Sequence, residues 1–282
     1  MAKKKTIALG LPWYMGPDVD CFDEFFAFLF YLGRLQERSW WMANSGIPIE
    51  ALPPLIAENA EPEGELTPED GQFEFLIAKE TRCSLVGRAR EEIVDMCLTA
   101  DADYLFMWDA DMRFKHSTFL RMMRHKKLIV NALAFTSRMP IQPCLYTINI
   151  QPQEGGELPW LSSETVFDYP KNKLITDEDV NGHLAFGTGV VLFDMTVFDM
   201  IPKPWFNATG CGEDWFFNTR AMHYKVPRYC DTSIKVFHKG HAPTFIGEPE
   251  YEKDRKEKPE VYEALKEIKV PEGITRLDEV IG

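Results

Sequence analysis

The 282-residue sequence has no CxxC pair, and its six cysteines follow no spacing typical of a disulfide framework. Isolated cysteines in a chain of this length are typical of reduced thiols in a cytoplasmic protein. No hydrophobic run is long enough to cross a bilayer, because the apolar stretch 22–32 is short and carries Asp23 and Glu24. The opening MAKKKTIALG has a basic cluster without the long apolar region of a signal peptide. We therefore expect a cytoplasmic protein without a transmembrane segment.

Positive charge is scarce, with 31 Lys and Arg against 44 Asp and Glu and a net charge of -13. A protein that grips nucleic acid mainly through its phosphates needs a basic field, so the charge disfavours that class and leaves only a local basic groove possible. Internal repeats are also absent. The apolar fraction of 45% and the 20 Phe are enough for a folded core. The length indicates one large α/β domain, with or without an appendage.

Hydrophobic periodicity gives a coarse order of elements. Residues 53–72, rich in Pro, Gly and Glu, indicate a solvated acidic insertion. The expected helices cover 20–36, 84–98, 117–125, 213–224 and 259–268. The expected strands cover 5–11, part of 40–50, 104–108, 127–135, 187–193, 226–230 and 233–238. Although G-T-G at 187–189 is similar to nucleotide-binding loops, no third glycine and no helix follow, so no phosphate cradle is predicted there.

The most informative segment is YLFMWDADM, residues 104–112. Its apolar part is typical of a buried parallel strand, and ionised acids at such a strand end need compensation. Residues i and i+2 of an extended segment point to the same side, so Asp109 and Asp111 can grip one divalent cation and leave positions for phosphate oxygens. Ligands of open α/β sheets bind at the carboxyl ends of strands, where this pair lies. Alternatively, Asp111 caps the helix that begins near His116.

Two arginines, Arg88 and Arg90, lie near the start of a predicted helix, where cations oppose the helix dipole. A bound anion such as a diphosphate would explain their position. Pairing with Glu91, Glu92 or Asp95 would explain it equally well, and the sequence does not decide between the two.

Four features stand in a fixed order: a first loop with Pro12 and Tyr14, the arginine-bearing helix before D-A-D, G-E-D-W-F-F opening a later helix, and V-P-R-Y-C-D-T-S-I-K-V-F-H ending at His238. This order resembles the GT-A glycosyltransferases, and among them the family 2-like enzymes with a DxD motif. The resemblance covers roughly residues 5–241. Its most specific parts are RAREEIVDMCLTADADYLFMWDADM and GEDWFFNTRAMHYKVPRYCDTSIKVFHKG.

The resemblance implies an α/β fold with a Rossmann-like, mixed but mainly parallel sheet flanked by helices. It implies a glycosyltransferase domain over residues 1–245, followed by a charged tail with one helix over 246–282. It also implies a nucleotide-diphosphate sugar, UDP- or GDP-linked, as donor. The acceptor would be a glycan, a small molecule or, against the net charge, a modified nucleic-acid base.

The same resemblance implies residue roles on the donor side. Asp109, Asp111 and His238 would hold Mn²⁺ or Mg²⁺, with Asp109 nearer the ribose or donor sugar. Pro12 and Tyr14 would receive the base, and Arg88 and Arg90 would face the ribose, the sugar or the phosphates. Apart from the resemblance, Lys239 and the region after His238 are expected to close over the diphosphate as a lid. One position departs from the pattern, because relatives often have Asn where this chain has Glu91.

On the acceptor side, Glu213 and Asp214 resemble an acidic pair from which one carboxylate removes the acceptor proton. Asp214 is the first candidate for this base and Glu213 the second. Alternatively, both acids only complement the dipole of their helix. Trp215 would wall the acceptor site or belong to the core.

The predicted function is therefore metal-dependent transfer of a sugar to an acceptor hydroxyl. Two alternatives stay open. A nucleotidyltransferase acting on sugar phosphates uses similar metal-binding acids, but its first loop is usually glycine-rich and basic, whereas LPWYMG contains no Arg or Lys. A catalytically silent nucleotide- or carbohydrate-binding protein can use the same fold.

Overall fold

A computed structural model of the chain describes residues 4–13, 19–44, 73–80, 83–151, 160–207, 212–240, 245–267 and 275–276. Tyr14, the predicted insertion 53–72 and Cys211 lie outside these ranges. The helices are α1 Val19–Asn44, α2 Val86–Thr99, α3 Thr118–Arg124, α4 Val197–Met200, α5 Glu213–His223, α6 Glu248–Glu257 and α7 Pro259–Glu267, with a 3-10 turn η3 at Asp177–Asp179. In the part of the chain that is described, no helix combines the length and apolarity needed to cross a membrane.

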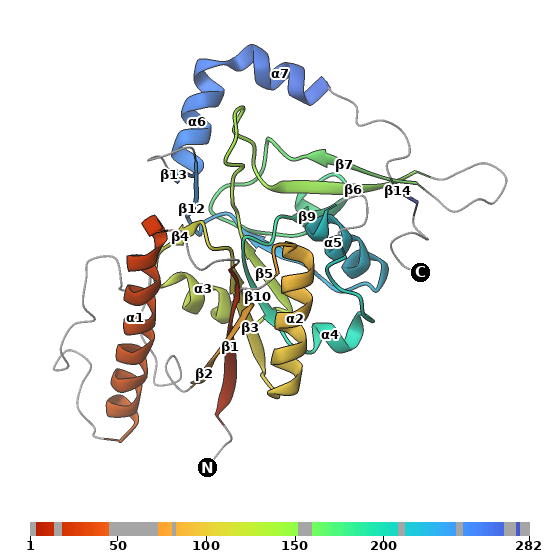
Figure 1. Cartoon of the computed structure of the whole chain (residues 1–282). Coiled ribbons are helices and arrows are strands. Elements are labelled where there is room, and N and C mark those ends of the chain that lie inside the picture. The colour runs from red at the N-terminus through yellow and green to blue at the C-terminus, as the bar shows by residue number, and fades with distance from the viewer. Residues whose placement is uncertain are drawn as a thin grey trace.

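The strands form one large and two small sheets (Figure 1). Those of the large sheet, in spatial order, are β2 Phe73–Glu80, β1 Lys5–Pro12, β3 Tyr104–Trp108, β10 Val190–Asp194, β5 Ile129–Ala132, β11 Tyr229–Asp231 and β8 Leu174–Ile175. Strands β2, β1, β3, β5 and β11 run in one direction, while β10 and β8 run against their neighbours. The predicted α/β class with a mixed, mainly parallel sheet is therefore confirmed.

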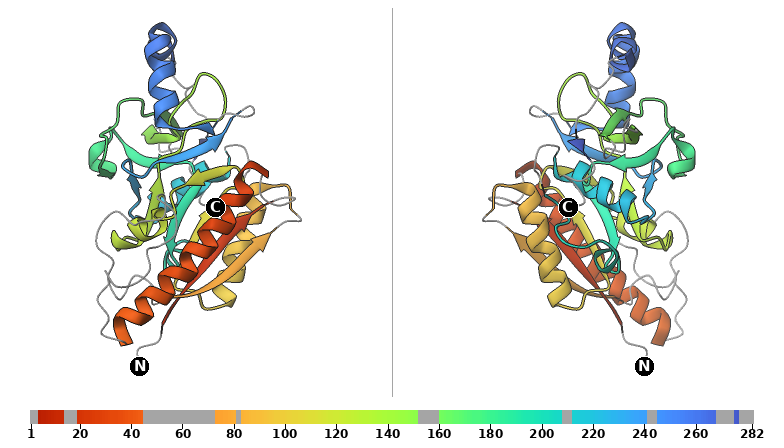
Figure 2. Two further views of the ribbon diagram at one scale, coloured as in Figure 1. Left: turned by 90° about the vertical axis from the view of Figure 1, so that its left-hand side faces the viewer. Right: turned by 90° about the vertical axis from the view of Figure 1, so that its right-hand side faces the viewer.

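Helices cover both faces of the large sheet (Figure 2). In β3, Phe106 and Trp108 belong to the core packed on α1 and α3, whereas Leu105 and Met107 belong to the core that includes α2. Successive side chains of a strand point to opposite faces, so a strand covered on both sides must be apolar throughout. This explains why 104–108 reads as an unbroken hydrophobic run.

The two small sheets lie beside the carboxyl ends of β1 and β3. In one, β12 Val236–Lys239 pairs with β4 Met112–Phe114 and β13 Phe245–Ile246. The other contains β6 Leu145–Gln151, β7 Trp160–Thr165, β9 His183–Phe186 and β14 Thr275–Arg276. The register of β12 on β4 places His238 opposite Met112, directly after the D-A-D segment.

Two predicted elements need correction. Helix α1 continues to Asn44, so the first part of the strand expected within 40–50 is helical, and the rest lies outside the described residues. The C-terminal region contains two helices, α6 and α7, where one was expected. Both helices pack on the domain through buried side chains: the Tyr251 ring stacks on Phe135 at 5.2 Å, and Tyr262 Oη donates to the Ile141 carbonyl at 2.9 Å.

Candidate active site

One buried arginine joins three carboxylates, one that follows β3 and two in the first turn of α5. The Arg90 side chain is 1% exposed and lies on the inner face of α2. Its Nη2 donates to both oxygens of Asp109, at 2.8 and 3.0 Å, and its Nη1 donates to Glu213 at 3.0 Å and Asp214 at 2.6 Å. These four residues are called the Arg90 cluster below. The cluster ties the end of β3 to the first turn of α5.

Helix α2 reaches the cluster because it carries glycine at position 87. A Cβ atom on Gly87 would lie 2.4 Å from the Phe206 carbonyl oxygen and 3.0 Å from Glu213 Cβ. Any larger residue would push α2 away from the segment that leads into α5. The spacing of Gly87 and Arg90, one helical turn, therefore fixes the close approach and the ion pairs together.

The Arg90 cluster has unequal numbers of charges, three carboxylates and one guanidinium. Burial disfavours the charged form of Arg90, but the attraction of Asp109, Asp214 and Glu213 outweighs it and raises the pKa of the guanidinium. Burial raises the pKa of the Asp109 carboxyl to about 6, although the charge of Arg90 acts in the opposite direction. The cluster is thus negative overall, and a further cation close to Asp109 would stabilise its ionised form.

Arg88, the other predicted donor contact, lies in a different environment. Its side chain is 71% exposed and its Nε donates to Glu92 Oε1 at 3.1 Å, one of the pairings that the sequence left open. Glu91, which departs from the family pattern, accepts hydrogen bonds from the backbone N–H groups of Trp205 and Phe206. Glu91 therefore anchors the segment before α5.

The two arginines should differ in their effects on stability. Arg90→Ala leaves three carboxylates without their shared counter-ion, and we expect it to lower the free energy of unfolding by about 3 kcal/mol, the lower end for a broken buried pair because the acids keep some solvent. Arg88→Ala removes an exposed pair and should change it by less than about 0.5 kcal/mol. Urea denaturation of both variants checks this, and two equal small effects would contradict the buried role of Arg90.

A second charged contact lies on the other side of the D-A-D segment. His238 Nε2 is 3.0 Å from Asp111 Oδ2, and His238 Nδ1 is 2.9 Å from the Phe135 carbonyl oxygen. The Lys239 backbone N–H donates to the Asp111 carbonyl at 2.9 Å, which holds β12 against this segment. Asp111 and His238, which were predicted to be neighbours, are 127 positions apart in the sequence, and the fold brings them together.

The hydrogen bonds of His238 set its chemistry. A carbonyl oxygen only accepts, so Nδ1 carries a hydrogen and Nε2 faces a carboxylate. Beside an ionised Asp111, Nε2 therefore either carries a proton that it donates to the carboxylate or binds the same cation as the carboxylate. Burial opposes the charged imidazole, but the hydrogen bond to Asp111 outweighs it and raises the pKa of His238.

These residues fit a divalent cation in part. Two ligand atoms bound at right angles at about 2.1 Å lie about 3 Å apart, and Asp111 Oδ2 and His238 Nε2 are separated by 3.0 Å. The Phe135 carbonyl orients the histidine as the outer partners of metal-bound histidines do. Asp109 faces Arg90, and no group of three or more His, Cys, Asp or Glu suited to a metal occurs among the described residues.

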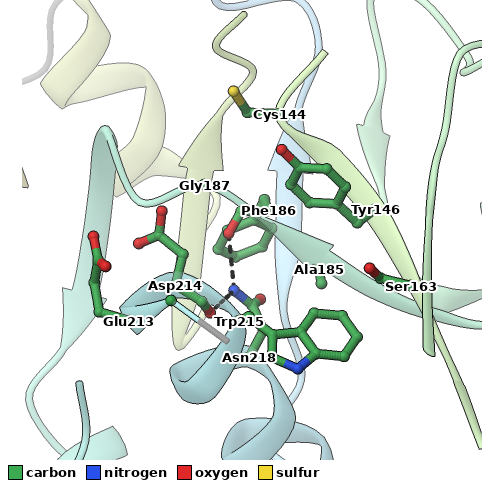
Figure 3. Close-up of a pocket in the computed structure, with 11 residues that line it drawn as sticks. Cys144, Tyr146, Ser163, Ala185, Phe186, Gly187, Glu213, Asp214, Trp215 and Asn218 are labelled. Carbon is green, nitrogen blue, oxygen red and sulfur yellow. Dashed lines mark hydrogen bonds between the residues drawn. The ribbon is translucent and has the colours of Figure 1, made fainter. Parts of the chain in front are cut away.

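A cavity of about 470 Å³ opens beside the Arg90 cluster (Figure 3). It is called the near cavity below. Its walls come from α5 and from the sheet containing β6, β7 and β9. The lining residues include Cys144, Tyr146, Ser163, Phe186, Gly187, Glu213, Asp214, Trp215 and Asn218. Burial raises the pKa of the Cys144 thiol to about 12, so this sulfur stays protonated and serves as part of the wall.

Asp214 presents a carboxylate to the near cavity from the first turn of α5 (Figure 3). Its Oδ1 accepts from Arg90 Nη1 and from the Thr188 hydroxyl. Its Oδ2 lies toward Gly187, where a Cβ atom would be 3.6 Å away. Glycine at 187 therefore leaves room beside Oδ2, and the G-T-G segment supplies a hydroxyl to Asp214 rather than a phosphate cradle.

The remaining predicted residues are placed as follows. Pro12 is the last residue of β1 and is buried, and neighbouring Trp13 donates its Nε1–H to the Trp108 carbonyl at 3.2 Å. Trp215 lines the near cavity and is half-buried, and its role at an acceptor site stays a prediction. Sequence reasoning missed Cys144 and Tyr146, which no motif marks. It also missed Thr188, which lies in the G-T-G segment but was given no role.

Comparison with known proteins gives no family assignment. No protein-family description and no curated protein matches the sequence. The protein A197 from STIV is similar over 59% of this chain and 72% of its own, with 19% identity and a TM-score of 0.34. A Bacillus anthracis protein assigned as a glucose-1-phosphate thymidylyltransferase is similar over 73% and 71%, with 11% identity and a TM-score of 0.31. A mannose-1-phosphate geranyltransferase from Thermus thermophilus is similar over 55% of this chain and 42% of its own, with 15% identity and a TM-score of 0.25.

Proposed function

We propose that the protein is a metal-dependent glycosyltransferase that moves a sugar from a nucleotide-diphosphate donor to an acceptor hydroxyl. One observation carries the proposal: the D-A-D segment lies between the Asp111–His238 pair and the Arg90 cluster, and Asp214 of that cluster faces the near cavity. A candidate cation site, an acidic centre and a cavity therefore lie next to one another. A glycosyltransferase needs such neighbours, because the donor diphosphate, the reacting carbon and the acceptor must meet.

Charge supports the dependence on a divalent cation. The Arg90 cluster keeps an excess of two negative charges when all three acids are ionised. A diphosphate placed against these acids without a counter-ion would be repelled. Asp111 and His238 would hold Mn²⁺ or Mg²⁺, with Asp109 completing the site if it turns from Arg90. When bound, the cation would neutralise the charge that develops on the departing diphosphate.

The reaction then needs a group that accepts one proton. The acceptor oxygen attacks the anomeric carbon, forming the new glycosidic bond while the bond from that carbon to the diphosphate oxygen breaks. The electron pair leaves with the nucleoside diphosphate, and the hydroxyl proton passes to a carboxylate. Asp214 Oδ2 suits this step because Arg90 and Thr188 bond to Oδ1 and hold the carboxylate still.

A panel of nucleotide-sugars tests the proposal. Purified protein is mixed with UDP-, GDP-, dTDP- and CMP-linked sugars, with and without Mn²⁺, and followed by thermal shift and by donor hydrolysis. A donor that binds the native state must raise the unfolding temperature, and we expect this only when Mn²⁺ is present. A panel without any shift or hydrolysis would overturn the proposal.

A further inference from the structure

A larger cavity adjoins the near cavity. This far cavity has a volume of about 720 Å³ and lies between the β6–β7 strands and the end of α7. Tyr146 and Ser163 line both cavities, so the two spaces share one wall. The other lining residues of the far cavity are Gln142, Glu164, Thr165, Phe167, Asp168, Leu265, Lys266 and Glu267. A pocket of about 300–1,000 Å³ usually binds one small ligand. A single sugar ring would occupy only the near cavity and would leave the far cavity empty.

The charges of the far cavity favour an uncharged occupant. Among the described residues, three acids and one cation line it, and the cation, Lys266, lies 3.0 Å from Asp168 and 3.2 Å from Glu263. Asp168 also accepts a hydrogen bond from Arg255 at 2.5 Å. Both cations are therefore paired with carboxylates of the protein itself. Together with Glu213 and Asp214 in the near cavity, this lining repels phosphate and sulfate groups from both cavities.

The uncharged lining groups suit a molecule rich in hydroxyls. Tyr146, Ser163, Thr165 and Gln142 carry groups that both donate and accept hydrogen bonds. The rings of Tyr146 and Phe167 offer apolar faces for C–H surfaces. Hydroxyl and amide groups beside aromatic rings match the hydroxyl and C–H surfaces of a sugar chain.

We propose that the acceptor is a neutral oligosaccharide or glycan chain that occupies both cavities, with its reacting hydroxyl at Asp214 and its further units between β6–β7 and α7. This inference rests on the proposed function, because the placement of the reacting hydroxyl at Asp214 assumes sugar transfer. The acidic lining disfavours a nucleic acid, which carries one phosphate per unit, as acceptor.

The test uses ladders of neutral oligosaccharides, from one to six hexose or N-acetylhexosamine units, and sulfated versions of the same ladders. Binding to the full chain is followed by saturation-transfer NMR in the presence of UDP and Mg²⁺, which is diamagnetic. Thr165→Trp fills the far cavity, and Glu267→Trp narrows it from an exposed helix end, so that at least one variant keeps the fold. Glu74→Trp, on the exposed edge strand β2, adds the same side chain elsewhere and is the matched control.

We expect at least one neutral ladder to gain about tenfold in affinity between one and four units, which is about 1.4 kcal/mol. The far-cavity variants should remove this gain and leave single-unit binding unchanged, while Glu74→Trp should preserve it. The proposal would be overturned if affinity did not rise with oligosaccharide length, or if it rose equally in the wild-type protein and the far-cavity variants. Tighter binding of the sulfated ladders than of the neutral ladders would also overturn it. Failure of the proposed function would show separately, as absent nucleotide-sugar hydrolysis in the wild-type protein.

Discussion

Replacing Asp111 by alanine should reduce sugar transfer by at least about a hundredfold, the upper range seen when even an outer partner of a metal site is removed. The substitution removes one of the two groups whose candidate ligand atoms lie 3.0 Å apart, the separation expected for neighbouring ligands of one cation. It should also abolish the thermal shift caused by nucleotide-sugar with Mn²⁺. The side chain of Asp111 is 43% exposed, so the unfolding temperature without ligands should stay close to wild type.

A matched control separates the loss of the cation from the loss of a surface acid. Asp199→Ala removes an exposed acid of α4 that lies outside the candidate site and should keep full activity. Assays run across a Mn²⁺ titration and with chelator complete the comparison. Wild-type turnover by Asp111→Ala in chelator would show that Asp111 holds no required metal.

Asp214→Asn should lower transfer by about a hundredfold or more, the usual scale of losing a general base. Asparagine keeps the shape and can still accept from Arg90 and Thr188 through its oxygen, while the group facing the near cavity can no longer take a proton. Donor and cation binding should remain nearly intact, because the Asp111–His238 pair is not touched. Single-turnover rates and donor affinities, measured side by side, check both statements.

Glu213→Gln is the companion variant for this prediction. Glu213 shares Arg90 Nη1 with Asp214 and lines the same cavity, so it is the second candidate for the base. We expect a smaller loss of transfer than for Asp214→Asn. A larger loss would move the base to Glu213. Lost donor affinity in Asp214→Asn, with turnover retained at saturating donor, would place Asp214 on the donor side.

The sequence predicted the elements that hold the site because local patterns define them. The apolar run 104–108 is β3, the helix expected at 84–98 is α2 at Val86–Thr99, and the helix expected at 213–224 is α5 at Glu213–His223. The segments between 140 and 186 were harder to assign, since β6, β7 and β9 pair with one another over long separations. Helix α1 was expected to end eight residues before Asn44, although Gly46 and Pro48 in the sequence directly after Asn44 are the usual signals of a helix end.

The Arg90 cluster was not predicted, although one signal for it exists. Arg90 is spaced three, four and seven residues before Ile93, Val94 and Cys97, all buried on α2, so it falls on the inner face of that helix. A buried guanidinium requires anionic partners. Its partners Glu213 and Asp214 lie 123 and 124 residues away, and only the fold identifies them.

The proposed function depends on one step, in which the bond between the sugar and the diphosphate breaks with help from a divalent cation. Phosphorus NMR of the wild-type protein with a nucleotide-sugar that it binds, Mg²⁺ and the best neutral oligosaccharide tests this most directly. We predict growing signals of the nucleoside diphosphate, no pyrophosphate, and no reaction after chelation. Formation of a nucleotide-sugar and pyrophosphate from a sugar 1-phosphate and a nucleoside triphosphate, without the first reaction, would contradict this prediction.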